Sequence, residues 1–346
     1  MKQKKLYNVA VLGATGAVGQ EMIKVLAERK FPIGELRLLA SARSAGKAVR
    51  YEGREVVIQE AYDAAFEGMD IVLGAAENDI AKRFAPAIQA AGAVFVDNSS
   101  AFRLDPDVPL VVPEINAEDA YTQKKGIIAN PNCSTIITLM ALAPIARISS
   151  IETIVASTYQ AVSGAGANGL TELEAQAQAY PKGEPLTANA FPHQILFNLL
   201  PRIGGIGENG YSSEEMKLQN EGRKILHLPE LRVTCTCVRV PVMRSHSISA
   251  TFTTKRPVSV EEARAAIAAA EGVQLVDNPN NDVYPMPLDT SDQDDVFVGR
   301  IRRDLVSENG LTLWCCGDQI RKGAATNAVQ IAELLVKSVS YTHLTL

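Results

Sequence analysis

The sequence lacks any apolar run that approaches the roughly 20 residues needed to cross a bilayer. Its first residues, Met1-Lys2-Gln3-Lys4-Lys5, lead straight into a strand-like pattern, without the apolar core of a signal peptide. It also lacks a basic surplus, because the formal net charge is -5 at pH 7. We therefore expect a cytoplasmic protein with no membrane or nucleic-acid partner.

Cysteine is scarce: there are five in 346 residues, Cys133, Cys235, Cys237, Cys315 and Cys316. An odd number without a secretory signal is typical of a reducing compartment. None has the spacing to histidine that a zinc site shows, so we expect no metal. Cys235 and Cys237 alternate on a predicted strand, which favours core packing.

The N-terminal region has the pattern of a nucleotide-binding unit. A buried strand at residues 8–12 is followed by a loop with glycine at 13, 16 and 19, and then by an amphipathic helix. Glycines at this spacing let a pyrophosphate approach the backbone at a helix N-terminus. The predicted cofactor-binding residues in this loop are Gly13, Thr15, Gly16, Ala17 and Val18.

The end of the second strand, residues 36–40, bears on the choice of cofactor. An acidic residue there would favour the 2′-hydroxyl of NAD, but the sequence offers Ser41, Arg43 and Ser44. A guanidinium and hydroxyls suit the 2′-phosphate of NADP(H), which we expect as the cofactor. The alternative is a solvated polar loop.

Further strands at residues 70–76 and 93–97 alternate with a helix, which indicates a doubly wound parallel sheet. The carboxyl ends of such strands line a ligand cleft. Arg103 and Cys133 both follow strands of this kind, so both could face a ligand.

Cys133 lies where an apolar strand pattern gives way to a long apolar helix pattern. Pro131 disfavours helix at Asn130, and Asn132 is a good N-cap, so Cys133 falls at or near the first helical position. The positive end of the helix dipole stabilises a thiolate there. We interpret Cys133 as a nucleophile, and the alternative is a buried structural cysteine.

The second half of the chain reads as an antiparallel α+β unit with a long excursion. A strand at 151–160 precedes a glycine-rich turn at 161–169 and a helix from Leu170 to about Tyr180. Residues 181–212 look irregular. A helix capped by Ser212 or Ser213 would place Glu214 and Lys217 on one face. Further helices are expected near residues 261–270 and from 324 to 337.

Two further side chains of this half carry chemistry. Arg239 ends the apolar face of a strand at 232–240, as either a surface ion-pair partner or an anion binder. Of four histidines, His246 begins a polar strand beside arginines and is the best candidate base for the thiol. A thiol, a histidine and a nicotinamide together suit hydride exchange with a carbon bound to sulfur.

Six motifs, taken in order, closely resemble the aspartate-β-semialdehyde dehydrogenase family. The likeness covers about residues 6–337, and several motifs in order are more specific than any one. The motifs are residues 13–19, 98–103, 130–135, 160–166, 239–246 and 322–330. The resemblance implies a Rossmann-type doubly wound domain and an α+β catalytic and dimerisation domain, as in the glyceraldehyde-3-phosphate dehydrogenase-like fold. It also implies NADPH-dependent reductive dephosphorylation of L-4-aspartyl phosphate to aspartate semialdehyde and phosphate.

The resemblance also assigns roles to residues. Cys133 would accept the acyl group, His246 would act as general acid/base, and Gln160 would orient the substrate. Arg239 would bind the α-carboxylate and Glu214 the α-ammonium. The remaining implied contacts are Arg103, Lys217 and Asn132 to phosphate, and Ser163, Gly164, Gly166 and Asn327 to the cofactor.

From the resemblance we expect an NADP-binding domain at 1–132 plus about 323–338, and a catalytic and dimerisation domain at 133–322. We expect a homodimer, or a tetramer. Residues 339–346 have no periodicity and look like a non-native tail. An alternative is N-acetyl-γ-glutamyl-phosphate reductase, although that family typically has glycine before the cysteine. Another is a non-catalytic NADP-binding sensor, against which the retained Cys133, Gln160, Arg239 and His246 speak.

Overall fold

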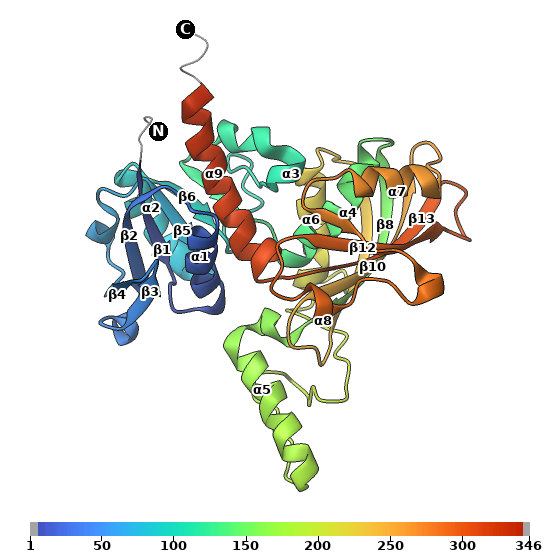
Figure 1. Cartoon of the computed structure of the whole chain (residues 1–346), viewed down its shortest axis with the longest axis horizontal. Helices are drawn as coiled ribbons and strands as arrows, with labels where there is room; N and C mark the ends of the chain where they lie inside the picture. Colours follow the sequence, from blue (N-terminus) through green and yellow to red (C-terminus); the bar gives the residue numbers. More distant parts are fainter. Residues whose placement is uncertain (1–5, 342–346) are drawn as a thin grey trace. The chain divides into compact units, whose positions relative to one another are not determined.

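The structure is a computed structural model that describes residues 6–341, with side chains to residue 337. The chain divides into two compact units. Unit 1 ends at Asn132 and resumes at Ala324, and unit 2 spans Cys133–Gly323. Each unit is built on one β-sheet with helices, which confirms the predicted α/β class (Figure 1).

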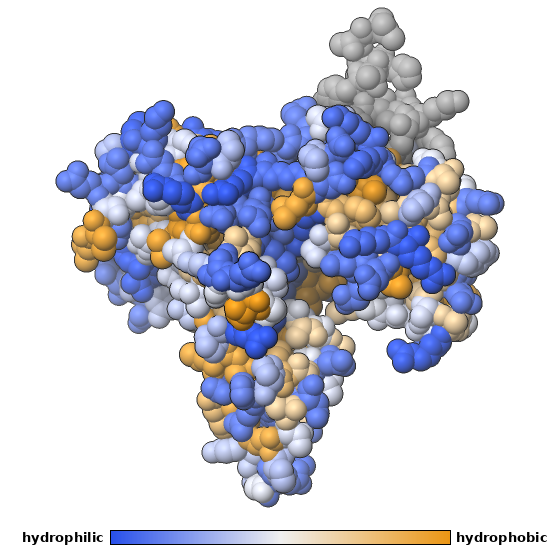
Figure 2. Space-filling model, turned by 180° about the vertical axis from the view of Figure 1, so that it is seen from behind, coloured by the Kyte–Doolittle hydropathy of each residue, from blue (hydrophilic) through white to orange (hydrophobic). Residues whose placement is uncertain are grey.

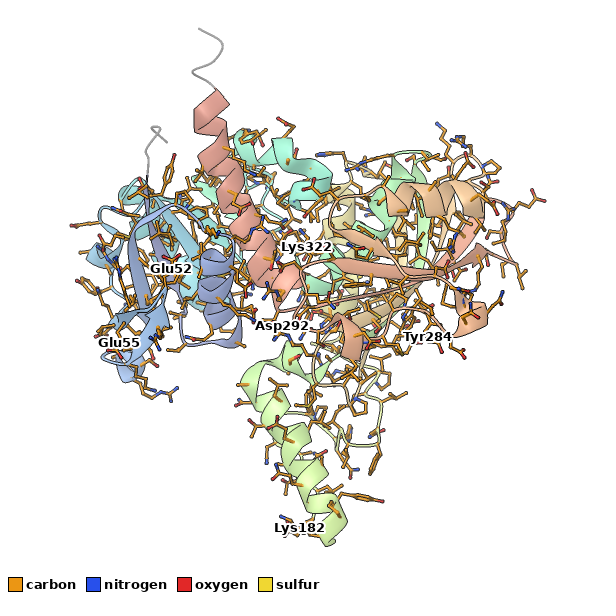
Figure 3. All side chains as sticks on the ribbon, in the orientation of Figure 1. Glu52, Glu55, Lys182, Tyr284, Asp292 and Lys322 are labelled. Atoms are coloured by element: carbon orange, nitrogen blue, oxygen red, sulfur yellow. The ribbon has the colours of Figure 1, made fainter. Side chains whose placement is uncertain are left out.

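The sheet of unit 1 has seven strands in the order β3-β4-β2-β1-β5-β6-β7. Every neighbouring pair is parallel except β3 and β4, which form a hairpin with Glu52 at its turn (Figure 3). This confirms the doubly wound sheet predicted from the alternating pattern. The strands are β1 (Tyr7–Leu12), β2 (Ile33–Ala40), β3 (Ala48–Tyr51), β4 (Arg54–Glu60), β5 (Ile71–Gly74), β6 (Val94–Asp97) and β7 (Ile127–Ala129).

The helices of unit 1 come from both ends of its sequence. The C-terminal helix α9 packs on α1, β5 and β6, and Val329 and Ile331 share a core with Val9 and Leu73. The helices are α1 (Ala17–Glu28), α2 (Asn78–Ala90), α3 (Pro113–Asn116) and α9 (Thr326–Tyr341), with short turns η1 (Ala42–Ser44), η2 (Asp63–Phe66) and η3 (Ala117–Thr122).

The last helix differs from its prediction at both ends. A π-helical turn, η7 (Arg321–Ala325), precedes it where the sequence predicted α-helix from 324. It then runs to Tyr341, past the predicted end at Lys337. Of the predicted tail, residues 342–346, including His343, lie outside the described part of the chain.

The sheet of unit 2 has six strands in the order β11-β12-β13-β10-β8-β9. It is mixed, because β8 pairs with β9 and β11 pairs with β12 in parallel. The prediction of an antiparallel unit was therefore wrong for these two pairs. The strands are β8 (Ile151–Gln160), β9 (Arg232–Arg239), β10 (His246–Thr254), β11 (Val273–Leu275), β12 (Val296–Arg303) and β13 (Gly310–Gly317).

Three helices of unit 2 cover one face of this sheet (Figure 1). They are α4 (Cys133–Ala146), α6 (Ser213–Ile225) and α7 (Val260–Ala268). Helix α4 is buried along almost its whole length, which explains its unbroken apolar sequence. No helix in the described residues is long and apolar enough to cross a membrane. The shorter elements are η4 (Val162–Ala165), η5 (Tyr180–Lys182), η6 (Pro279–Asn281) and α8 (Pro287–Thr290).

Helix α5 (Gly166–Ala179) forms an arm that projects from the sheet of unit 2, with Lys182 near its far end (Figure 3). It begins four residues before the predicted start at Leu170. The buried carboxylate of Glu172 accepts the backbone N–H groups of Asn189 (2.6 Å) and Ala190, which ties the returning chain to the arm. Residues 181–212 are therefore irregular, as predicted, but hydrogen bonds hold part of this segment to α5.

The N-terminus of α6 generates a prediction about stability. Ser212 caps it: its hydroxyl accepts the N–H of Glu215 (3.3 Å), and the Glu215 carboxylate accepts the N–H of Ser212 (2.7 Å). We expect Ser212→Ala to lower the free energy of unfolding by about 1 kcal/mol, because loss of the capping hydroxyl leaves the N–H of Glu215 unpaired. Urea denaturation measures it, with exposed Ser213→Ala as the control. Equal losses in both variants would contradict the capping role.

Candidate active site

Cys133 is the first residue of α4 and the only partly exposed cysteine of the five, all of which are described. A helix N-terminus favours an anion, so this position suits a thiolate. The start of the helix confirms the position predicted from residues 130–135.

Cys237, Cys315 and Cys316 are poor nucleophiles. Burial raises the pKa of Cys315 well above the ordinary thiol value, and it raises that of Cys316 to about 12. The pKa of Cys237 is also raised, by its contact with Cys235 and by burial. These thiols stay protonated at neutral pH, and only Cys133 combines exposure with a helix start.

The strand pairing of unit 2 gathers Gln160, Arg239 and His246 at one edge of the sheet. Gln160 ends β8 and is paired with Arg239, which ends the parallel strand β9. Strand β10 runs antiparallel to β8, so its first residue, His246, lies at the same edge. An antiparallel β9 would have carried Arg239 to the opposite edge.

Arg239 is a buried cation at the centre of this cluster, 6% exposed. Its Nη1 donates to the carbonyl oxygen of Ala161 at 2.6 Å. Burial lowers the pKa of Arg239, whereas the charges of Cys133 and Glu214 act in the opposite direction. The guanidinium therefore stands within electrostatic reach of the candidate nucleophile.

Gln160 is held in one orientation by two partners. Its Oε1 accepts the hydroxyl of Thr158 (3.0 Å), and its Nε2 donates to Oε1 of Glu214 (3.2 Å). The other carboxylate oxygen of Glu214 accepts Nζ of Lys217 at 2.8 Å. The prediction that Glu214 and Lys217 share a helix face is confirmed.

His246 is fully buried, with both ring nitrogens in contact with donors. The backbone N–H of Ala161 donates to Nδ1 at 3.1 Å, and Nε2 lies 3.4 Å from Nε2 of Gln160. Burial lowers the pKa of His246 to about 3, Arg239 acts in the same direction, and Glu214 opposes them. The imidazole is therefore neutral across the physiological pH range.

Residues that the sequence did not single out support this cluster. Ser245 precedes His246 in a left-handed conformation with φ 74°, a strained state for a residue with a side chain. Gln319 accepts the N–H of Ser245 (2.9 Å) and donates to the hydroxyl of Ser163. No sequence signal marks this arrangement, because the partners lie about 70 or more residues apart.

A single buried carboxylate, Asp318, fixes the turn that carries Gln319. It accepts Nε of Arg244 at 2.5 Å and the backbone N–H groups of Asp292, Ile320 and Arg321 at 2.6–3.0 Å. Asp318 thereby connects the segment before His246 to two loops.

The nucleotide loop of unit 1 has the features a pyrophosphate needs. Gly13 has φ 87°, and a Cβ there would come within 2.6 Å of the oxygen of Ala75. Gly16 caps α1 without a side chain, so nothing covers the helix N-terminus from that position. The loop thus fits a dinucleotide.

The other predicted residues of unit 1 fall into two groups. Ser41 and Arg43 are exposed after β2, and Ser44 is buried in η1. Arg103, Asn132 and Asn327 are buried: Arg103 donates to the carbonyl oxygens of Asn130 (3.0 Å) and Asn98 (2.8 Å), and Asn327 donates to Val111 and Asn130. The described residues contain no group of three or more potential metal ligands.

Comparison with known proteins identifies the family. Residues 8–123 match "Semialdehyde dehydrogenase, NAD binding domain", and residues 142–322 match "Semialdehyde dehydrogenase, dimerisation domain". The aspartate-semialdehyde dehydrogenase of Aquifex aeolicus is 52% identical over 334 residues, covering 96% of this chain and 98% of its own. That of Bacillus subtilis is 46% identical, covering 95% and 97%. The chain belongs to the aspartate-semialdehyde dehydrogenase family.

Solved structures of aspartate-semialdehyde dehydrogenases share the fold. Enzyme II of Vibrio cholerae, described as complexed with ASA, is 43% identical with a TM-score of 0.94, covering 96% of this chain and 99% of its own. The Candida albicans enzyme, described as with NADP, is 27% identical with a TM-score of 0.73, covering 96% and 99%. The family resemblance and the enzyme class inferred from the sequence are confirmed.

The packing around Gly164 predicts a loss of activity in this aspartate-semialdehyde dehydrogenase. A Cβ there would lie 2.7 Å from Nη1 of Arg239 and 3.1 Å from Cε1 of His246. We expect Gly164→Ala to lower kcat/KM at least about tenfold, because the added methyl group would displace Arg239 and His246, which are expected to bind the substrate and to act as acid/base.

Gly205→Ala provides the matched control, since its Cβ would meet nothing within 4 Å. Steady-state kinetics and the melting temperature would be measured for both variants. Normal kinetics in the Gly164 variant would show that the close approach of Arg239 and His246 is not required.

Proposed function

We propose that this enzyme reduces L-4-aspartyl phosphate with NADPH, giving L-aspartate 4-semialdehyde and phosphate through a thioacyl intermediate on Cys133. The step would supply lysine (through diaminopimelate), threonine, methionine and isoleucine biosynthesis in the cytoplasm. The observation that carries the proposal is the convergence of Gln160, Glu214, Arg239 and His246 at one edge of the unit 2 sheet.

The charges of this cluster complement an aminoacyl phosphate. The guanidinium of Arg239 suits the α-carboxylate in a bidentate pair, and the carboxylate of Glu214 suits the α-ammonium. Lys217 would meet the phosphate, together with Arg103 and Asn132, the other phosphate ligands that the resemblance implies. Lys217 and Glu214 form an ion pair (2.8 Å), and binding of the substrate would exchange this pair for contacts with the substrate's own charges.

The proposed chemistry requires a thiolate close to the acyl carbonyl group of the substrate. Sulfur attacks the acyl carbon, the phosphate leaves, and a thioester remains on Cys133. NADPH supplies the hydride that reduces the thioester carbon. Gln160 holds the acyl group, because its amide is fixed by Thr158 and Glu214. A non-catalytic sensor would have no need of this fixed polar cluster.

The residues present suit NADP(H) rather than NAD. No carboxylate follows β2, and Arg43 is exposed beside Ser41 and Ser44. The nicotinamide end would meet Ser163, Gly164 and Gly166, with Asn327 as a further cofactor residue.

We also propose a homodimer formed through unit 2, whose family description is a dimerisation domain. The arm and the chain returning from it expose apolar side chains, and Figure 2 shows apolar surface along the arm. The most exposed are Tyr180 (57%), Phe197 (70%), Leu199 (57%) and Ile206 (55%). Such a surface is typical of a subunit contact.

One assay tests the proposed reaction in its reverse direction. Purified enzyme is given phosphate, NADP⁺ and either aspartate semialdehyde or N-acetylglutamate semialdehyde, and NADPH absorbance is followed. We expect turnover with the aspartate compound. Turnover with the N-acetylglutamate compound alone would favour N-acetyl-γ-glutamyl-phosphate reductase, and tight NADPH binding without turnover would favour a sensor.

In the same assay we expect Cys133→Ala to abolish NADPH formation, because the acyl carbon then has no covalent partner. NADPH binding, followed by fluorescence titration, should be nearly unchanged. Cys235→Ala is the control for losing a thiol, since Cys235 is buried. Activity that persists in the Cys133 variant would remove it as the nucleophile.

Arg43→Ala tests the cofactor preference. We expect KM for NADP⁺ to rise about 10- to 100-fold, because a charge-assisted hydrogen bond to the 2′-phosphate is lost, while KM for NAD⁺ stays nearly constant. Arg54→Ala is the control, since this exposed arginine begins β4 at the opposite end of the parallel β2–β4 pair. Equal changes for both cofactors would contradict recognition of the 2′-phosphate by Arg43.

A further inference from the structure

We propose that Phe191, on the chain that returns from the arm, is a positioning residue for Arg239. Its aromatic ring borders the guanidinium on one side and keeps the edge that binds a carboxylate in place. The position of the ring follows from contacts within unit 2 alone. Its effect on substrate binding rests on the proposed function, in which Arg239 binds the α-carboxylate.

Two contacts restrict the guanidinium of Arg239. Its carbon Cζ lies over the ring of Phe191, 6.0 Å from the ring centroid. This is about the limit at which an aromatic face attracts a cation, and the attraction is stronger where water is excluded. At one end of the guanidinium, Nη1 donates to the carbonyl oxygen of Ala161 at 2.6 Å. A ring on one side and a hydrogen bond at one nitrogen leave this buried group little freedom to turn.

The edge that remains is the one that suits a carboxylate. Within the part of the chain that the structure describes, Nε and Nη2 of Arg239 have no hydrogen-bond partner, whereas Nη1 has one. The N–H groups of Nε and Nη2 point in parallel, and their spacing matches the two oxygens of a carboxylate. Because both bonds form only in one orientation, a guanidinium that turns freely would lose affinity for the carboxylate.

The segment that carries Phe191 also holds the backbone of Arg239. Leu200 and Arg239 exchange two backbone hydrogen bonds: the N–H of Arg239 donates to Leu200 at 2.8 Å, and the N–H of Leu200 donates back at 3.0 Å. Leu200 belongs to a small apolar cluster against which Phe191 packs. Residues 191–200 therefore place both the main chain and the side chain of Arg239.

Helix α5 anchors the chain on both sides of Phe191. Before it, the buried carboxylate of Glu172 accepts the backbone N–H of Ala190. After it, the buried amide of Gln176 accepts the backbone N–H of Leu196 at 2.9 Å. Hydrogen bonds from one helix thus fix the path of the backbone that presents the ring.

The tip of the ring has a second neighbour, Gly169 in the first turns of α5. A Cβ at Gly169 would lie 3.1 Å from Cζ of Phe191, so the ring fits because this residue has no side chain. A tyrosine at position 191 would direct its hydroxyl group into α5. The suitable replacement is therefore leucine, which keeps an apolar side chain at this partly exposed position and lacks the aromatic face.

Phe191→Leu tests the effect on substrate binding in the reverse assay. We expect KM for aspartate semialdehyde to rise about 5- to 30-fold, the range for losing a desolvated contact between a cation and an aromatic face. The KM values for phosphate and NADP⁺ should stay nearly constant, because Arg239 is assigned to neither ligand. A purely structural defect would change all three KM values together or lower kcat alone, and either result would overturn the proposal.

Leu186→Ala is the matched control, since Leu186 packs against the same apolar cluster and carries no aromatic face. We expect its KM for aspartate semialdehyde to remain that of the unaltered enzyme. An equal rise in both variants would show that general loosening of the arm is the cause, and an unchanged KM in Phe191→Leu would remove the positioning role.

A crystal structure of Phe191→Leu without substrate tests the contact independently of any reaction. We expect the guanidinium of Arg239 to move or to occupy more than one rotamer, while Leu186→Ala leaves it in place. A single, unmoved Arg239 side chain in the Phe191 variant would overturn the proposal. Failure of the proposed function is seen separately, as an unaltered enzyme that does not turn over aspartate semialdehyde.

Discussion

The active-site cluster depends on the direction of one strand pairing. Because β8 and β9 are parallel, Gln160 and Arg239 end at the same edge of the unit 2 sheet, and the antiparallel β10 begins there with His246. Parallel pairing requires a long crossover between the two strands. That crossover contains the arm and α6, and α6 brings Glu214 back to Gln160 at 3.2 Å.

This edge is also an unusual electrostatic environment. A buried arginine, a buried neutral histidine and a partly buried carboxylate lie beside a helix start, and their burial weakens screening by solvent. In such surroundings the charge state and the orientation of each group depend on its hydrogen-bond partners. The cation of Arg239 is held by the carbonyl of Ala161, and the N–H of the same residue faces His246. Ala161 therefore contacts both the charged guanidinium of Arg239 and the uncharged ring of His246.

Local signals in the sequence were sufficient to predict several features of the fold around the site. The start of α4 at Cys133, the cap at Ser212 and the Glu214–Lys217 pair follow from short-range rules, and the structure agrees with each. The pairing of β8 with β9 could not be derived in this way, because an alternating pattern fixes which face is buried and not the strand direction. The left-handed Ser245 is likewise held by a distant partner, Gln319. The roles of individual site residues still rest on the family resemblance.

Asp318 shows how support for the site reaches beyond the residues that touch substrate. Its one carboxylate accepts hydrogen bonds from the side chain of Arg244, from the backbone of the distant Asp292 and from backbone N–H groups of its own turn. The same turn carries Gln319, which holds Ser245 in its left-handed conformation. The position of the segment that leads into His246 therefore depends on a carboxylate that lies 72 residues further along the chain. One carboxylate thus acts as a joint between three backbone segments, and the imidazole inherits its position from that joint.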